Sequence, residues 1–265
     1  MANILEQLAD YARLRVRRDR EQVSAAQLLA AIDDMERSGT ARAPFRFENA
    51  LRGGELSFIC EVKKASPSKG LIDPEFHYRE IAREYEAAGA DCISCLTEPK
   101  WFLGSDAIFR EIRSLVDTPM IRKDFTIDEY QIYQAKAMGA DAVLLICALL
   151  DEKTLISFFR VCEELGLSAL VETHDEEEMK MAAAVGGRLI GVNNRNLKDF
   201  SVNIDNSRRL RELAPEDALF VSESGIRGPQ DIPPLRESGV DAVLVGEALM
   251  RSDDKKKTLE ALRNA

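Results

Sequence analysis

GADAVLLI, residues 139–146, places a glycine directly before a short apolar run. Similar phrases occur three more times, as GADCISCL at 89–96, GRLIGV at 187–192 and GVDAVLV at 239–245. Glycine favours the left-handed conformation that ends many helices, and short apolar runs are typical of buried parallel strands. The repeated phrase therefore predicts a series of helix-to-strand turns in an α/β fold.

Further apolar runs lie between these phrases and bring the number of expected strands to eight. Amphipathic segments such as 108–116 and 155–162 separate them. Eight strands alternating with helices favour a closed (β/α)8 TIM barrel, with an open doubly wound parallel sheet as the alternative. No G-x-G-x-x-G motif follows the first run, so a dinucleotide site has no support. The expected strands are 57–62, 91–97, 119–123, 141–147, 167–172, 188–193, 218–223 and 241–246.

Residues 1–50 stand outside this alternation, and we interpret them as an N-terminal helical extension of a barrel that occupies 51–265. A first helix is predicted by an apolar stripe. Ser24 and Gln27 form a capping box that opens a second helix. The stripe consists of Ile4, Leu5, Leu8, Tyr11 and Leu14.

The composition is that of a globular chain, with 45% hydrophobic and 31% charged residues. A net charge of -10 argues against nucleic-acid binding, which usually requires an excess of Lys and Arg. An anionic ligand would therefore need a local positive site.

The expected location is the cytoplasm. The longest apolar run, 142–150, is well short of the roughly 20 residues that span a membrane, and the N-terminus shows no signal pattern.

Cys92 and Cys95 are three apart on an expected strand, so they should face opposite sides and share no metal. The scattered cysteines suggest no disulfide framework: Cys60, Cys92, Cys95, Cys147 and Cys162.

Polar residues close several apolar runs, where a barrel of this type carries its active site. Glu61 and Lys63 are two apart and should enter the same mouth. One such residue is as often a rim charge as a functional group, but burying several at one end is costly without a function. The set of candidates is Glu61, Lys63, Lys123, Glu172, Asn193 and Glu223.

An anion site is expected after the last two strands, the frequent phosphate site of this fold. Ser224-Gly225 follows one and Gly246-Glu247 the other. Glycine there lets backbone amides approach an anion, and a helix N-terminus adds a favourable dipole. Arg195 could add a bidentate contact.

Six phrases closely resemble the indole-3-glycerol-phosphate synthases of tryptophan biosynthesis. Together they are specific, and they cover the chain from about 57 to 250. They are EVKKASPSKG (61–70), LTEPKWFLGS (96–105), RKDF (122–125), LVETH (170–174), GVNNRNL (191–197) and VSESGI (221–226).

The resemblance implies roles for individual residues. Lys123 would be the main general acid and Glu172 its acid-base counterpart, while the remaining charged and amide groups, Glu61, Lys63, Asn193 and Glu223, would hold and polarise the substrate. Ser66 would lie near the carboxylate, and Phe102 and Phe125 would sandwich the anthranilate ring. Phosphate would be held by Arg195, Ser224, Gly225, Gly246 and the backbone around Glu247.

The implied reaction needs no metal and no cofactor. It converts 1-(2-carboxyphenylamino)-1-deoxyribulose 5-phosphate to indole-3-glycerol phosphate by ring closure, decarboxylation and dehydration. A Lys123 acid poised near neutral pH would require desolvation or a neighbouring cation. The Glu247 carboxylate should turn away from phosphate. Trp101 either stacks on the substrate or has a lid or core-packing role. His174 is expected to fix the loop before a helix at Asp175.

Two alternatives remain open at this point. One is another sugar-phosphate barrel, a lyase, an isomerase or an aldolase that uses Lys63 or Lys123 in a Schiff base. The other is a barrel without activity that binds an anion or a protein. A monomer and a homodimer are equally compatible with the sequence.

Overall fold

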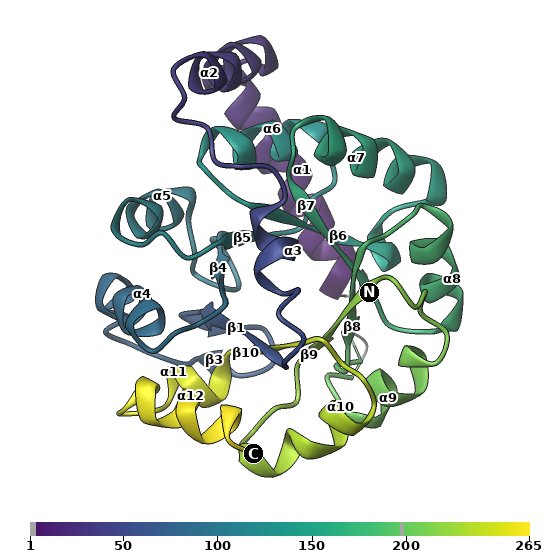
Figure 1. Ribbon diagram of the computed structural model, residues 1–265. Coiled ribbons are helices and arrows are strands. Elements are labelled where there is room, and N and C mark those ends of the chain that lie inside the picture. Colours follow the sequence, from purple (N-terminus) through teal and green to yellow (C-terminus); the bar gives the residue numbers. More distant parts are fainter. Residues whose placement is uncertain (1–3, 197–198) are drawn as a thin grey trace.

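The computed structural model describes residues 4–196 and 199–265, so Leu197 of the GVNNRNL phrase lies outside the described residues. The chain folds into a TIM barrel in which parallel strands close on one another in the order β1-β10-β9-β8-β7-β6-β5-β4 (Figure 1). The predicted strands agree with the observed ones to within about one residue at each end. The barrel strands are β1 (Ser57–Val62), β4 (Cys92–Leu96), β5 (Met120–Lys123), β6 (Ala142–Ile146), β7 (Ser168–Thr173), β8 (Leu189–Asn193), β9 (Leu219–Glu223) and β10 (Ala242–Val245).

Helices surround the barrel, and a short antiparallel pair, β2 (Ala65–Ser66) with β3 (Gly70–Leu71), lies in the loop after β1 (Figure 1). No described helix is long and apolar enough to cross a membrane. The outer helices are α4 (Tyr78–Ala87), α5 (Asp106–Leu115), α6 (Glu129–Ala137), α7 (Glu152–Glu164), α8 (Glu176–Ala184), α9 (Asp205–Arg211), α10 (Pro233–Glu237), α11 (Glu247–Met250) and α12 (Lys255–Arg263), with 3-10 turns η1 (Cys147–Leu149) and η2 (Pro229–Asp231).

The repeated glycines end helices as predicted in three of the four phrases. Gly89, Gly139 and Gly239 have φ of 80°, 80° and 71°. In the fourth phrase the assignment of Gly187 is wrong. The last helical residue of α8 is Ala184, which puts the left-handed position on Gly186, with φ of 79°.

The aspartate of the phrase ties neighbouring strands together. Asp91 accepts the Phe58 N–H at 2.7 Å, Asp141 the Met120 N–H at 2.8 Å, and Asp241 the Phe220 N–H at 2.7 Å. Each carboxylate thereby satisfies a backbone donor within the first two residues of the strand beside its own. The repeat thus encodes both the end of a helix and the start of strand pairing.

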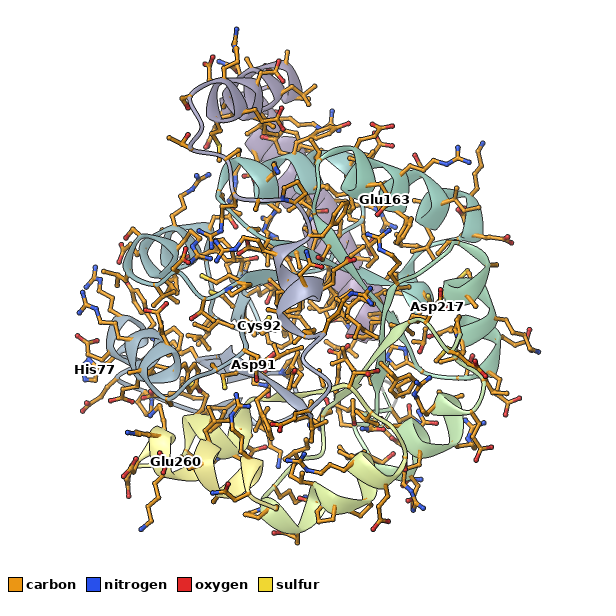
Figure 2. All side chains as sticks on the ribbon, in the orientation of Figure 1. His77, Asp91, Cys92, Glu163, Asp217 and Glu260 are labelled. Carbon is orange, nitrogen blue, oxygen red and sulfur yellow. The ribbon has the colours of Figure 1, made fainter. Side chains whose placement is uncertain are left out.

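Two apolar layers follow from the alternation of side chains along each strand. One fills the barrel and the other lies between strands and helices. Cys92 packs in the inner layer and Cys95 in the outer one, which confirms that they face opposite sides. Cys92 lies near the middle of the barrel in Figure 2, whereas His77 is at its periphery.

The first helices close opposite ends of the barrel. The short helix α3 (Arg46–Ala50) puts Phe47 into the inner layer, and α1 (Ile4–Gln22) passes behind the barrel in Figure 1. The predicted stripe on α1 is partly wrong. Leu14 is 59% exposed, because the buried face follows a helical period through Leu8, Ala12 and Arg15. The capping box at Ser24 is confirmed and opens α2 (Ala25–Arg37).

Candidate active site

A cavity of about 570 Å³ opens at the carboxyl ends of the barrel strands. Ile4, Leu5 and Leu8 of α1 form part of its wall. Within the described residues, no three His, Cys, Asp or Glu side chains are arranged to hold a metal ion. Every candidate from the sequence lines this cavity: Glu61, Lys63, Ser66, Phe102, Lys123, Phe125, Glu172, Asn193, Arg195, Glu223, Ser224, Gly225, Gly246 and Glu247.

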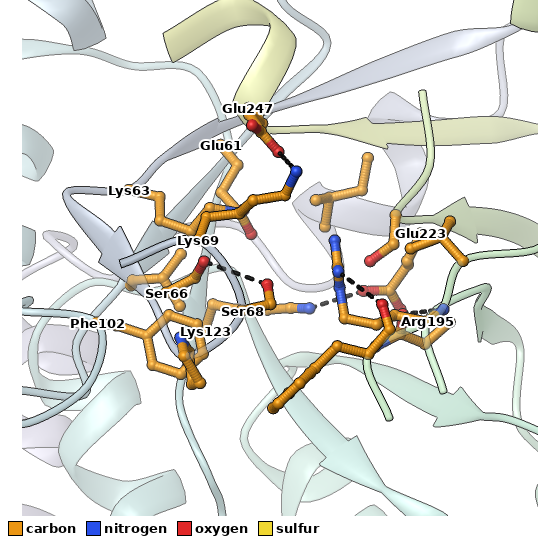
Figure 3. Close-up of a pocket in the computed structure, with 18 of the residues that line it drawn as sticks. Glu61, Lys63, Ser66, Ser68, Lys69, Phe102, Lys123, Arg195, Glu223 and Glu247 are labelled. Atoms are coloured by element: carbon orange, nitrogen blue, oxygen red, sulfur yellow. Dashed lines mark hydrogen bonds and ion pairs between the residues drawn. The ribbon is translucent and has the colours of Figure 1, made fainter. Parts of the chain in front are cut away.

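Two lysines and three carboxylates form a buried cluster on the cavity floor. The Lys123 Nζ lies 2.6 Å from Glu223 Oε2 and 3.4 Å from Glu172 Oε2, and Lys63 pairs with Glu61 (Figure 3). These residues meet because the parallel register puts strand ends at one level, with Asn193 opposite Glu223. The convergence predicted from the sequence is therefore present.

The charges of the cluster set its protonation. Burial disfavours the Lys123 ammonium, but Glu223, Glu172 and Glu61 outweigh this and raise its pKa. Lys123 is therefore desolvated, but its neighbours are carboxylates and not the cation that would lower its pKa toward neutrality. Burial raises the pKa of Glu223, and Lys123 only partly offsets it, leaving a pKa of about 7.

Glu172 behaves in the opposite way from Glu223. Burial would raise its pKa, but Lys123, His174 and Asn193 prevail and lower it to about 2. Two carboxylates in one cluster thus have pKa values that are pushed apart, a pattern typical of acid-base sites.

Two glycines leave room for the cluster. A Cβ at Gly191 would overlap Glu223 Oε1 and would lie 3.1 Å from Leu170. One at Gly246 would lie 2.6 Å from Glu61 Oε1 and 2.9 Å from Lys63 Nζ. Gly246 therefore accommodates the Glu61–Lys63 pair in addition to any contact with an anion.

The predicted anion end is built from the loops after β8, β9 and β10. Ser224 and Gly225 both have positive φ, 65° and 101°. Helix α11 is a single turn, so it offers backbone amides but little dipole. The Glu247 side chain turns to Lys69 at 3.4 Å and Arg251 at 3.1 Å, which removes the conflict expected with phosphate.

The opposite end of the cavity is apolar. The Phe102 and Phe125 rings pack against one another at 6.0 Å with planes inclined by 44°. A third ring between the two phenylalanines would require them to separate, because carbon atoms in contact lie about 3.5–4.0 Å apart on each face. Trp101 is outside the cavity lining and lies edge-on to Tyr11 of α1 at 5.7 Å. This contact favours the lid or packing alternative for Trp101 over stacking on the substrate.

Glu98 is a functional candidate that sequence reasoning missed. Its buried carboxylate accepts the backbone N–H groups of Lys100 at 2.9 Å, Trp101 at 2.7 Å and Phe102 at 3.0 Å. These bonds shape the loop that carries Phe102 into the cavity. The sequence did offer a signal for Glu98, because it lies two residues after the end of β4, where active-site residues of a barrel are found.

Asp124 was also missed, although it directly follows Lys123. Arg15 of α1 donates to both of its oxygens, at 2.5 and 3.0 Å, and Thr97 Oγ1 donates at 2.5 Å. This buried pair fastens the helix over the mouth to the segment that bears Lys123 and Phe125. The partner lies 109 residues away, beyond what spacing along the chain can reveal.

Arg15→Ala should lower the free energy of unfolding by about 3 kcal/mol at neutral pH, because it strips a buried carboxylate of its main partner. Burial opposes ionisation of Asp124, yet Arg15 lowers its pKa from 3.8 to about 2. Because the folded pKa is the lower one, this stabilisation exists above 3.8 and disappears as the pH falls toward 2. Urea unfolding at several pH values measures it.

The matched control is Arg13→Ala, which removes an exposed arginine of α1 that pairs with Asp10. It should change stability by less than about 1 kcal/mol. An Arg15→Ala protein as stable as the parent at neutral pH would show that the Arg15–Asp124 pair does not stabilise the fold.

His174 is partly buried and lies beside Glu172 as well as at the start of α8. Its Nε2 lies 3.4 Å from Glu172 Oε1 and its Nδ1 3.0 Å from Glu178 Oε2. The sequence interpretation covered only the loop, where the His174 N–H donates to Glu178 at 2.8 Å and Asp175 caps α8. The two-residue spacing from Glu172 was the signal for the second contact.

Comparisons with known proteins identify a family for the whole chain. The sequence model of the family "Indole-3-glycerol phosphate synthase" matches residues 5–262. An indole-3-glycerol phosphate synthase of Ruminiclostridium cellulolyticum is 53% identical over 262 residues, covering 99% of both chains. One of Lachnoclostridium phytofermentans is 44% identical over 268 residues, covering 98% of this chain and 99% of the relative.

Solved structures share the fold at much lower identity. A 3-hexulose-6-phosphate synthase superposes with a TM-score of 0.65 and 15% identity, covering 79% of this chain and 99% of the other. A thiamine phosphate pyrophosphorylase of Pyrococcus furiosus gives 0.61 and 21%, covering 81% and 96%. At this identity the two structures resemble the chain in its barrel fold only.

Proposed function

The chain belongs to the indole-3-glycerol phosphate synthase family, and from that premise we propose how its cavity carries out the reaction. The enzyme is a carboxy-lyase of tryptophan biosynthesis that forms indole-3-glycerol phosphate from 1-(2-carboxyphenylamino)-1-deoxyribulose 5-phosphate. The single observation that supports our assignment of roles is the Lys123 ammonium held between Glu172 and Glu223.

The chemistry requires two proton donors and one acceptor. In ring closure, the ring carbon that bears the carboxylate attacks the ketone carbon, and the ketone oxygen takes up a proton. Loss of carbon dioxide returns the bonding electrons to the ring. The new hydroxyl then leaves as water with a second proton, and the carbon beside nitrogen gives up one proton. Each turnover therefore takes up one proton from solution.

We assign the donor roles to the lysines and the acceptor role to Glu172. Lys123 is the main general acid, supported by its place in the cavity and by the carboxylate neighbours that keep it protonated. Glu172 is its acid-base counterpart and remains ionised at neutral pH because its pKa is lowered to about 2. Glu61, Lys63, Asn193 and Glu223 orient and polarise the substrate, with protons exchanging at Glu223 near neutral pH.

The substrate is expected to lie across the cavity from the phenylalanines to the glycine loops. Its ring would pack on Phe102 and Phe125, with its carboxylate near Ser66. Its phosphate would contact Arg195, Ser224, Gly225, Gly246 and the backbone of Glu247. The expected lysines, carboxylates and amides all line one cavity, which supports this placement.

Arg195→Ala should raise KM by about 10-fold to 100-fold and change kcat much less, because a charge-assisted contact of roughly 1.5–3 kcal/mol to phosphate is lost. Steady-state kinetics with the phosphorylated substrate measure both constants. An unchanged KM would remove Arg195 from the anion site. Arg83→Ala, on the exposed face of α4 and outside the cavity lining, provides a control for a general loss of positive charge.

The assay that tests the proposed function mixes the protein with the carboxyphenylamino sugar phosphate and follows indole fluorescence without added metal or nucleotide. Formation of indole-3-glycerol phosphate is expected. Borohydride added during turnover should leave the lysines unlabelled, whereas an aldolase would be trapped on Lys63 or Lys123. Absence of product, or covalent trapping, would overturn the proposal.

We further propose a cytoplasmic enzyme whose partner is the small anionic substrate, with no nucleic acid and no membrane. The free, buried cysteines support the cytoplasmic location. The net charge of -10 supports the absence of a nucleic-acid partner. Residues 1–50 are proposed to extend the barrel of 51–265, since Leu5 and Leu8 line the cavity and Phe47 packs inside the barrel. One chain supplies this cavity, so a monomer and a homodimer would work alike.

A further inference from the structure

His174 stands between two carboxylates at the edge of the active site. Its side chain is 15% exposed, with Nδ1 3.0 Å from Glu178 Oε2 and Nε2 3.4 Å from Glu172 Oε1. A neutral imidazole has one donor and one acceptor nitrogen, whereas both nitrogens of an imidazolium donate. With a carboxylate facing each nitrogen, the geometry favours the charged ring.

Neighbouring groups hold the imidazole in place. The Glu178 carboxylate also accepts the backbone N–H of His174 at 2.8 Å, and Asn206 Nδ2 donates to the His174 carbonyl at 3.0 Å. Burial disfavours the charged ring, but the hydrogen bond to Glu178 and the charges of Glu172 and Glu178 prevail and raise the pKa of His174 to about 10. The ring is therefore fixed and charged at neutral pH.

Glu172 receives partners on both oxygens. Lys123 lies 3.4 Å from Oε2, while Asn193 Nδ2 donates to Oε1 at 3.2 Å and His174 approaches the same atom. When Lys123 gives its proton to the substrate, Glu172 loses one cationic neighbour. His174 keeps its charge through that step.

We propose that His174 is a positioning residue that orients the Glu172 carboxylate and keeps it ionised while Lys123 changes its protonation state. This inference rests on the function proposed for Glu172. It concerns proton removal during aromatisation, where Glu172 must point at the carbon beside nitrogen. Glu178 serves as the outer anchor of the ring.

The charge of the ring is tested directly by NMR of the two histidines in the chain. Long-range proton–nitrogen spectra of the imidazoles, assigned with His77→Gln, should show both His174 nitrogens protonated at pH 8. A neutral His174 ring at pH 7 would overturn the proposal. This measurement does not depend on activity, so it is separate from any failure of the assigned reaction.

The effect on catalysis is tested with His174→Gln, which keeps an amide donor and removes the charge. We expect kcat to fall about 10-fold to 100-fold with KM within about twofold, because a poorly oriented base slows the chemical step. Loss of a positive neighbour raises the pKa of Glu172, so the acidic limb of the kcat/KM profile should move to higher pH. His77→Gln, exposed and paired with Glu75, should match the parent.

The charged and titratable groups around His174 determine how kcat/KM depends on pH. They are Glu172 on β7, Glu178 and the capping Asp175 on α8, and Lys123 across Glu172. The Cys147 thiol of η1, whose pKa burial raises, lies near the same carboxylates. Glu178→Gln provides a second variant that leaves His174 in place. It should lower the His174 pKa and reduce kcat less than His174→Gln does. Unchanged kcat and pH profile in both folded variants would refute the role.

Discussion

Lys123→Met is expected to lower kcat by about 100-fold to 10,000-fold, the range typical when a general acid is removed. Methionine fills a similar volume without charge, so the cavity keeps its shape. Glu172 and Glu223 would then face each other without the ammonium that lies between them. Rates of indole formation measure the loss, and far-ultraviolet circular dichroism verifies the fold.

The Lys123→Met substitution should also change how the stability of the fold depends on pH. Without Lys123, the pKa of Glu223 rises further above its value of about 7, and the carboxyl takes up a proton on folding. Because that folded pKa exceeds the unfolded one, Lys123→Met should be most stable on the acidic side and lose stability as the pH rises through neutrality. Lys180→Met, on an exposed lysine paired with Glu177, is the control. Parent-like turnover in Lys123→Met would eliminate Lys123 as the acid.

Glu172→Gln should reduce kcat by about 100-fold or more, because the amide cannot accept the proton released in aromatisation. Glutamine preserves size and a hydrogen-bond acceptor, so KM should change little. The measurement is steady-state kinetics across a range of pH.

The pH profile provides a second, independent readout for this variant. Glu172 is among the carboxylates that raise the pKa of Lys123. Its removal lowers that pKa, so the alkaline limb of kcat/KM should move to lower pH. Glu177→Gln, exposed on α8, should leave both limbs unchanged. A Glu172→Gln enzyme with normal kcat would show that another group removes the proton.

Much of this barrel could be predicted from local features. The glycine-led phrases locate helix ends, and the apolar runs give strands such as Ser57–Val62 correctly. Parallel pairing then brings strand-end residues such as Lys123 and Glu172 to one level, which is why the charged cluster was predictable.

Other features depend on contacts between segments that are distant in the chain. The Arg15–Asp124 pair requires knowing the path of α1 over the mouth. The apolar stripe was misjudged at Leu14 because the sequence alone did not show that an arginine, Arg15, occupies the buried face. The direction of the Lys123 pKa shift could not be predicted, because the three carboxylates that raise it come from three separate strands.

The packing of Trp101 against Tyr11 offers a built-in optical probe, since the chain has one tryptophan. Its emission should change when α1 lifts from the mouth, while the barrel strands remain intact. Opening of this cover could then be timed in stopped-flow mixing without attaching any dye, and compared with the rate at which product departs.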